Sequence, residues 1–462
     1  MDSQRPESVH RRHFTWSITF ILMVTTLIWP AFHNGFPLVF YDTGGYLARP
    51  FERTLEIGRS VLYGAFLALG SPLDFWPNIV AQAALAAWLV LLALRSHGLG
   101  HRPIVALFVT LTLALLTSLP WYAAQLMPDI LVPEAVLALY LVAFRRCALR
   151  RSEAVLLCAV IAFAIASHMA TLGLMLGLLA VALGLHLLGS RLARPRLATP
   201  ALAVVVGIGL ALLSNLAITG RFAFTPGAAT IAFVRLVDHG ITKRYLDDKC
   251  PDATIMLCAY RNELPEDRDT WIWGETTPLN KLGGWENHDS EAQRIFLESL
   301  ALYPGRHLKS ALSNTLEQFM RVKTGERLSP WTWHVRSTIE RYAPDSYPRF
   351  IAARQQNERF DFTWLNFVHI PVFALSTVAL PVFVGLAGGR VRRSVGSLAL
   401  FVLFALLGNA AICGAFASPH DRYQSRLVPL AALTVAIAVL SWWRDRGSEW
   451  RKPSSIRSEY SS

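Results

Sequence analysis

Residues 200–218 read PALAVVVGIGLALLSNLAI and contain no charged side chain. About 20 consecutive apolar residues let an α-helix cross the hydrocarbon core of a bilayer, where no water is present to satisfy an open backbone. This stretch therefore predicts a membrane-spanning helix. It decides the class of the whole chain because runs of the same kind recur on both sides of it.

Nine further apolar runs have the length and composition of spanning helices. They cover residues 15–32, 75–94, 103–119, 130–145, 153–169, 171–189, 364–386, 394–416 and 425–443. The whole chain is 53% hydrophobic and only 16% charged, whereas soluble domains are about 25% charged. We therefore expect an all-α polytopic membrane protein with about ten transmembrane helices. The shorter apolar stretch 58–70 is better suited to an interfacial or re-entrant helix.

The basic residues orient these spans. Those on one side of the predicted bundle are Arg11, Arg12, Arg95, Arg102, Arg145, Arg146, Arg150, Arg151, Arg191, Arg194, Arg196, Arg390, Arg392, Arg393, Arg444, Arg446, Arg451 and Lys452. Short loops rich in Arg and Lys stay in the cytoplasm, so both termini are expected there. The net charge of the chain is +12, but its basic residues lie between apolar runs rather than on one basic face. This distribution argues against a nucleic-acid partner. The expected location is the bacterial inner membrane.

The predicted spans divide the chain into four parts. Residues 1–218 form a seven-helix membrane module, 219–363 a small α+β or mainly α extracytoplasmic domain, 364–445 a three-helix module, and 446–462 a disordered cytoplasmic tail. The inserted segment has no Asn-x-Ser/Thr acceptor, which favours a bacterial periplasm over an ER lumen. It is expected to contain a helix near 290–322. Cys250 and Cys258 lie in this segment and are expected to form a disulfide outside the cytoplasm.

Polar residues gather in the loops predicted to face outward. The first of these loops contains Asp42, Gly44, Gly45, Tyr46 and Arg59; the others contain Asp129, His168, His420, Arg422, Tyr423 and Arg426. Each residue also has a structural interpretation. The two acids can cap helices, the histidine at 168 can end one, and the late arginines can anchor a helix at the interface. Ionisable groups shared by one membrane face nevertheless favour a functional site.

These side chains suit chemistry on a lipid phosphate. A carboxylate can accept a proton from an attacking hydroxyl group, and arginine donates two parallel hydrogen bonds to a phosphate. The chain has no phosphate-binding G-x-x-x-x-G-K-[ST] loop, H-E-x-x-H zinc motif or G-x-S-x-G elbow. The sequence therefore lacks the usual signals of ATP-driven transport and of zinc or serine hydrolysis.

The order of these elements resembles the GT-C superfamily of integral membrane glycosyltransferases, which use lipid-phosphate-linked sugars. The resemblance rests on Asp42 after the first span, the segment GRSVLY at 58–63, Pro128-Asp129, and Arg422-Tyr423 followed by Arg426 and Pro429. Seven spans before the inserted segment also agree with the seven-helix module of that family. Asp42 departs from the paired acids of many members because Thr43 follows it, and the soluble part is inserted rather than C-terminal.

The resemblance implies a set of roles. Asp42 would be the catalytic base, or would bind the acceptor or a divalent metal ion, and Asp129 would be the second acid. The implied substrate-binding residues are Tyr46, Arg59, His168, His420, Arg422, Tyr423 and Arg426. The donor would be a polyprenyl-phosphate-linked sugar, and the acceptor a glycan, lipid or protein at the outer face of the membrane.

Three other classes of protein remain open at this point. An envelope polysaccharide polymerase or ligase would use diphosphate-linked oligosaccharides, so the choice of donor separates it from the first hypothesis. A transporter or flippase of lipid-linked sugars would move substrate without covalent change, although its usual signs are related halves and charges near the midplane. A scaffold protein without activity would use the inserted segment for binding.

Overall fold

The computed structural model describes residues 5–188, 195–266, 268–330, 334–385 and 389–449. Its regular elements are all helical, and no strand occurs among these residues. The first half contains α1 (Arg5–Leu27), α2 (Trp29–Asn34), α3 (Tyr41–Glu52), α4 (Val61–Gly70), α5 (Trp76–Ser96), α6 (Pro103–Leu116), α7 (Leu119–Ala123), α8 (Leu131–Phe144), α9 (Arg151–Ser167), α10 (Met169–Leu187) and α11 (Ala198–Thr219).

Within its described residues, the segment between the apolar runs contributes nine helices to the second half. These are α12 (Ala228–Asp238), α13 (Ile241–Lys249), α14 (Arg268–Trp273), α15 (Pro278–Lys281), α16 (Gly284–Leu302), α17 (Pro304–Met320), α18 (His334–Tyr342), α19 (Tyr347–Ala352) and α20 (Arg354–Asn357). The chain then continues through α21 (Thr363–Gly385), α22 (Gly389–Phe416), α23 (Asp421–Ser425) and α24 (Val428–Glu449). Short 3-10 turns cover Ser71–Leu73, Pro128–Ile130, Arg146–Ala148, Met256–Tyr260 and Pro344–Ser346.

Six helical segments in the described parts of the chain are long and apolar enough to cross a membrane. They are Trp76–Ser96, Met169–Leu187, Ala198–Thr219, Thr363–Gly385, Val395–Phe416 and Asp421–Arg446. The other four predicted spans are also helical, but their apolar parts are shorter. Local structure shortens two of these helices. α6 ends just before Thr117, whose hydroxyl donates a hydrogen bond to the Leu113 carbonyl, and α8 begins only after a 3-10 turn at Pro128–Ile130. The fold is thus that of an all-α membrane protein.

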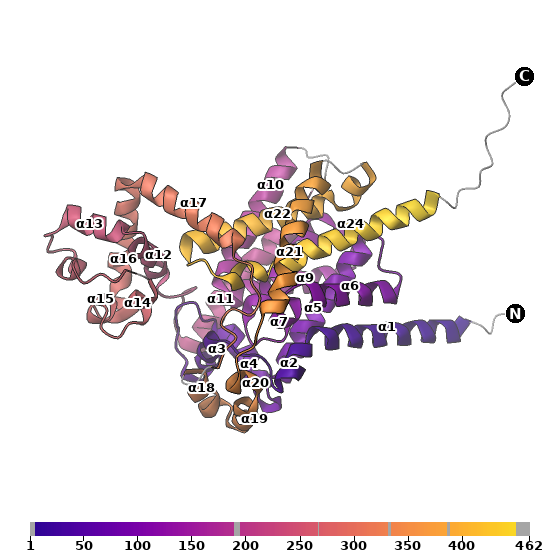
Figure 1. Ribbon diagram of the computed structural model, residues 1–462, viewed down its shortest axis with the longest axis horizontal. Coiled ribbons are helices and arrows are strands. Elements are labelled where there is room, and N and C mark those ends of the chain that lie inside the picture. Colours follow the sequence, from indigo (N-terminus) through magenta and orange to yellow (C-terminus); the bar gives the residue numbers. More distant parts are fainter. Residues whose placement is uncertain (1–4, 189–194, 267, 331–333, 386–388, 450–462) are drawn as a thin grey trace, which may run out of the picture.

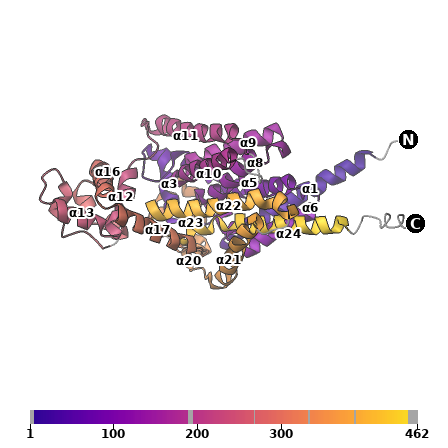
Figure 2. The same ribbon diagram turned by 90° about the horizontal axis from the view of Figure 1, so that it is seen from above.

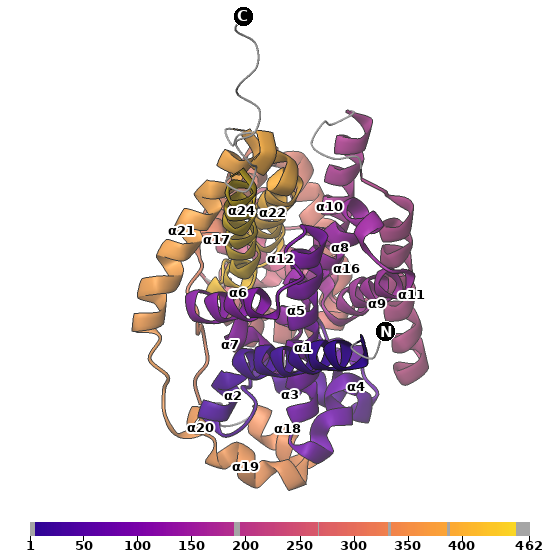
Figure 3. The same cartoon turned by 90° about the vertical axis from the view of Figure 1, so that its right-hand side faces the viewer.

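Helices α1 and α24 lie roughly along the long axis of the molecule, whereas α21 is steeply inclined to it (Figure 1). Figure 1 shows α1 and α24 projecting from one end of the molecule, with α12–α16 at the other end. Figure 2, the view from above, keeps the same order, and Figure 3 looks along the axis onto the end from which α1 and α24 project. The predicted tail lies mostly outside the described residues, at 450–462.

The segment expected to form one soluble domain is divided into two parts. Residues 228–302, here called the lobe, have a core of their own around Phe233, Tyr245, Trp271 and Ile295, and the disulfide Cys250–Cys258 lies beside it. Residues after 303 instead pack on the membrane helices, and their buried side chains belong to the main core.

The predicted helix at 290–322 is divided at the same place. Pro304 has no backbone N–H and cannot continue the preceding helix, but it is well tolerated in the first turn of a new one. Tyr303 therefore ends α16 and serves as the N-cap of α17. This break allows α17 to leave the lobe and reach α22.

The core of the lobe contains a histidine that makes its stability depend on pH. His288 is fully buried between Phe233 and Trp271, and neither ring nitrogen has a hydrogen-bond partner among the described residues. Burial lowers the pKa of His288 to about 4. Because the folded value lies below the ordinary 6.5, the unfolded lobe takes up the proton first, so stability is complete above pH 6.5 and falls as the pH decreases towards 4.

We expect His288→Leu to remove this dependence. In the wild type, the opening free energy of α12 and α16 should fall by up to about 3 kcal/mol between about pH 7 and 4.5, measured by hydrogen exchange of the intact protein with correction for intrinsic rates. In the His288→Leu variant, the opening free energy of the same helices should fall much less over this pH range. An equal loss in both proteins would assign the pH dependence to another group.

Candidate functional site

A short backbone pairing brings the first two polar loops together. The Leu38 N–H donates to the Ala124 carbonyl at 2.9 Å, and the Leu126 N–H donates to the Leu38 carbonyl at 2.8 Å. The Thr43 hydroxyl also donates to the Leu126 carbonyl. These contacts hold the start of α3, with Asp42, beside the turn that carries Asp129.

Asp42 lies in the first turn of α3, where a carboxylate is favoured by the helix dipole. The sequence interpretation placed Gly44 and Gly45 in an outward-facing loop, but both are helical. Their lack of a side chain serves close packing instead. A Cβ on Gly45 would lie 3.1 Å from the Arg59 guanidinium, and a Cβ on Gly44 would lie 3.2 Å from the Val335 backbone of α18. Gly45 therefore allows Arg59 to lie across α3 and reach Asp42.

Two arginines bind the carboxylate of Asp42, one on each oxygen. Arg59 Nη2 donates to Oδ1 at 2.5 Å, and Arg422 Nη1 donates to Oδ2 at 3.3 Å. The acid itself is 3% exposed. Arg59 precedes α4 and Arg422 lies in α23, so the pair joins the first and last quarters of the sequence.

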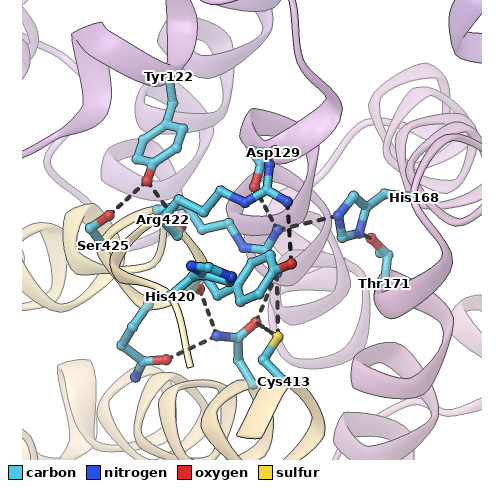
Figure 4. Close-up of polar contacts among 12 residues, drawn as sticks. Tyr122, Asp129, His168, Thr171, Cys413, His420, Arg422 and Ser425 are labelled. Atoms are coloured by element: carbon cyan, nitrogen blue, oxygen red, sulfur yellow. Dashed lines mark hydrogen bonds and ion pairs between the residues drawn. The ribbon is translucent and has the colours of Figure 1, made fainter. Parts of the chain in front are cut away.

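A second ion pair lies deeper than the first. Arg426 is 1% exposed, and its Nη1 donates to Asp129 Oδ1 at 2.8 Å. The same Nη1 lies 3.4 Å from His168 Nε2, which must accept the hydrogen bond because the guanidinium has only donors. The Nη2 of Arg426 donates to Asn409 Oδ1 of α22 at 3.1 Å. Figure 4 shows Asp129 and His168, from the first half of the chain, facing side chains of the last part, among them Cys413 and Arg422.

Aromatic rings separate and support the two arginines. The Arg422 guanidinium lies 4.5 Å from the Phe40 ring centroid and 4.8 Å from that of Tyr423, while Arg426 lies 5.5 Å from Tyr423. Tyr122 fixes the backbone between them, because its hydroxyl donates to the Arg422 carbonyl and lies 2.6 Å from the Ser425 hydroxyl. The flanking rings limit how far either guanidinium can move.

Glu326 is a member of the site that the sequence interpretation missed. Its Oε1 lies 2.8 Å from His420 Nδ1, and its Oε2 accepts the backbone N–H of Arg422 at 2.9 Å. Gln318 adds a second support, since its side chain bonds both the N–H and the carbonyl of His420. Both come from the inserted segment, where no periodic or spacing signal linked them to the late arginines.

A cavity of about 420 Å³ opens at these residues. Eight of the predicted site residues line it, namely Asp42, Tyr46, Arg59, Asp129, His168, His420, Arg422 and Tyr423. Arg426 is not part of the lining and supports the wall through Asp129. Ile231, Val234 and Ile272 of the lobe also line the cavity, so the lobe covers one side of it.

A second hollow of about 800 Å³ lies on the other side of Arg422. It is lined by Lys323, Thr324, Gly325, Glu326, Phe360, Phe362, Thr363, Trp364, Asn366, Phe367, Ile370 and Asp421. A small pocket of about 20 Å³ lies between the two regions, because it shares Asp129 and Arg422 with the cavity and Glu326 with the hollow. Four aromatic side chains line the hollow together with the charged Lys323, Glu326 and Asp421, and the cavity likewise combines charged residues with apolar ones.

The charges of the site reinforce one another. Burial raises the pKa of Asp129, but Arg422 and Arg426 outweigh it and hold the pKa below its usual range. Burial likewise opposes ionisation of Glu326, yet its bonds with His420 and Arg422 lower the net pKa. Burial raises the pKa of Tyr41, at the cavity wall, to about 12, so its phenol stays protonated at neutral pH. Asp129 and Glu326 are therefore anions at neutral pH, and they hold Arg422 and Arg426 in place.

The residues do not fit a metal site. No group of three or more His, Cys, Asp or Glu side chains in the described parts of the chain is placed to hold a metal ion. Asp42, the acid that the resemblance linked to a metal ion, binds two arginines instead. We therefore assign no step to the divalent metal ion that the resemblance allowed.

Comparison with known proteins adds no family to this description. No protein-family model matches the sequence, and no match is found among curated proteins. The site must be interpreted from its own geometry.

Proposed function

We propose that this chain is a membrane glycosyltransferase that moves a sugar from a polyprenyl-phosphate donor to an acceptor at the outer face of the membrane. One observation carries the proposal: Arg59 and Arg422 converge on opposite oxygens of one carboxylate at the wall of a cavity. Two guanidinium groups so arranged suit a phosphate, which arginine binds through paired hydrogen bonds. In this proposal, Asp42 binds the two arginines until a phosphate replaces it.

The same residues can perform the transfer. A donor phosphate that binds Arg59 and Arg422 competes with Asp42 and frees its carboxylate. Asp42 then takes the proton of the acceptor hydroxyl as the acceptor oxygen bonds to the anomeric carbon of the sugar. The bond from that carbon to the phosphate oxygen breaks, and the oxygen keeps the electron pair. The two arginines stabilise the negative charge that develops on the leaving polyprenyl phosphate.

A lipid donor is supported by the aromatic-lined hollow beside Arg422. Trp364 and Phe367 of α21 are 80% and 74% exposed at its edge, as is common for aromatic residues near a membrane interface. We propose that the hollow takes the isoprenoid chain of a donor whose phosphate binds at Arg422, the residue that lines both the cavity and the small pocket next to the hollow.

The proposed topology has ten spans, both termini in the cytoplasm and the cavity in the periplasm of a bacterial inner membrane. It is supported by the arginine-rich loops of one side and by the position of α1 and α24 opposite the lobe in Figure 1. In this arrangement the lobe lies beside the proposed cavity and contributes Ile231, Val234 and Ile272 to its wall. The acceptor would then enter between the lobe and the membrane helices.

A donor panel tests the proposal directly. Purified protein in nanodiscs is given labelled polyprenyl-monophosphate sugars, polyprenyl-diphosphate oligosaccharides, and an envelope extract as acceptor. Release of polyprenyl phosphate from a monophosphate donor supports the glycosyltransferase. Use of diphosphate donors alone would identify a polymerase or ligase, and movement of labelled lipid across the bilayer without covalent change would identify a flippase.

Glu326→Gln should weaken transfer without abolishing it. The amide keeps the size of the side chain but carries no charge, so the charge-assisted bonds to His420 and to the Arg422 backbone are lost. Its single oxygen can accept from one of them, and its NH2 group can bond His420 Nδ1 only as a donor, which requires the neutral ring with its proton on Nε2. We expect kcat/KM to fall by roughly 10- to 100-fold, the effect of losing one or two hydrogen bonds to a charged group. Glu326→Asp should recover part of the loss. Equal activity of the Glu326→Gln variant and the wild type would show that Glu326 does not position Arg422.

A further inference from the structure

Large apolar side chains are exposed along the hairpin of α16 and α17. They are Leu297, Leu300, Leu302, Leu308, Leu312, Leu316 and Met320, each between 42% and 71% exposed. In the rest of 219–363, as far as the structure describes it, Phe222 and Met256 are the exposed large hydrophobic residues. Exposed apolar side chains gathered on two consecutive helices, here called the strip, favour a surface that is covered by something other than water.

The polarity of α17 is inverted relative to a helix of a water-soluble protein. Leu308, Leu312, Leu316 and Met320 follow one another at intervals of four and share its exposed face. The inward face is polar: Gln318 is fully buried and holds His420, and Asn314 is 5% exposed with its amide 2.8 Å from His239 Nε2. Such a helix can be stable only if the medium on its outer face is itself apolar.

Close packing joins this helix to a membrane-spanning one. A Cβ on Gly414 would lie 2.6 Å from the Asn314 carbonyl, so α17 and α22 approach backbone to backbone. α22 contains the candidate span Val395–Phe416. Figures 1 and 2 both show α17 between the lobe and α22, which places its exposed face beside the end of the membrane bundle nearest the lobe.

The charges around the strip fit a phospholipid surface. Arg306 and Lys309 are exposed near the start of α17, and Lys323 is exposed beyond its end. Long basic side chains can extend from an apolar face to reach lipid phosphates. The one exposed acid near the end of the helix, Glu317, is paired with Arg321.

We propose that α17 is an interfacial membrane helix whose Leu308, Leu312, Leu316 and Met320 face is covered by lipid acyl chains of the leaflet nearest the lobe. The segment between the apolar runs is then only partly aqueous: most of the lobe is in water, whereas α17 and the end of α16 with Leu297, Leu300 and Leu302 lie at the lipid surface. This arrangement anchors the lobe beside the cavity and holds Gln318 against His420. It does not depend on the proposed reaction.

Fluorescence quenching tests the proposal on the full-length protein in nanodiscs. In a Cys147→Ser background, which removes the exposed native thiol, bimane is attached separately to Leu312→Cys and Leu316→Cys. Glu275→Cys, on the exposed surface of the lobe, is the control. The quenchers are phospholipid with a spin label near the top of the acyl chain, and aqueous iodide.

The expected result is opposite for the two regions. The lipid quencher should reduce the fluorescence at 312 and 316 at least twofold more than at 275, and iodide should show the reverse order. Iodide quenching at 312 and 316 equal to that at 275 would overturn the proposal by placing the face in water. Protection from both quenchers, with a 312–312 crosslink between copies, would overturn it by replacing lipid with a second copy of the chain.

Discussion

Asp42→Asn is expected to abolish sugar transfer while leaving the donor bound. The carboxylate is the proposed proton acceptor, and an amide cannot take up the proton, so kcat should fall by about 10³-fold. Arg59 and Arg422 would no longer be held by an anion that competes with the phosphate. The apparent affinity for the donor should therefore stay the same or increase. Single-turnover transfer and equilibrium binding of a labelled donor measure the two effects separately.

The separation of the two effects distinguishes chemistry from a loss of structure. An ion pair that served only to hold the fold would lower binding and transfer together, whereas a lost base lowers kcat alone. Asp74→Asn is a matched control, because Asp74 also binds an arginine, Arg349, but lies outside the cavity lining. It should transfer at the wild-type rate. Full activity of the Asp42→Asn variant would assign the proton to another acceptor.

The composition of this cavity could be predicted from sequence because topology restricts it. With the expected alternation of ten apolar runs across the bilayer, the loops that carry Asp42, Asp129, His168 and Arg422 are predicted to face one side. The pairings inside the cavity could not be predicted in the same way. They depend on the backbone pairing of Leu38 with residues 124–126 and on the close approach allowed by Gly45, neither of which has a sequence signal.

The inserted segment was harder to predict for a physical reason. Leucines at 308, 312 and 316 are visible in the sequence as one face of a helix, but an amphipathic pattern does not say which face is outward. In water the leucines would be buried; in α17 the polar face is buried instead. The packing partner decides between the two, so Gln318 and Glu326 could be recognised as part of the site only once α17 was seen against α22.

Arg426→Gln is expected to destabilise the whole membrane bundle. Arg426 is fully enclosed, and its guanidinium is the direct partner of the Asp129 carboxylate. Removing one member of a buried pair leaves an uncompensated charge and costs about 3–5 kcal/mol. The loss should appear as a lower unfolding temperature in detergent, with the helices near α8 and α23 opening first by hydrogen exchange.

The double variant Asp129→Asn with Arg426→Gln separates stability from function. Two neutral amides can hydrogen-bond to each other, so much of the lost stability should return, and the double variant should unfold at a higher temperature than Arg426→Gln alone. Activity should not return with it, because neither amide can supply the charge that orders the phosphate site through Asp129 and Arg422. Recovery of both stability and transfer would show that the Asp129–Arg426 pair has a structural role only. Recovery of neither would mean that His168 and Asn409, which also bind Arg426, need the guanidinium itself.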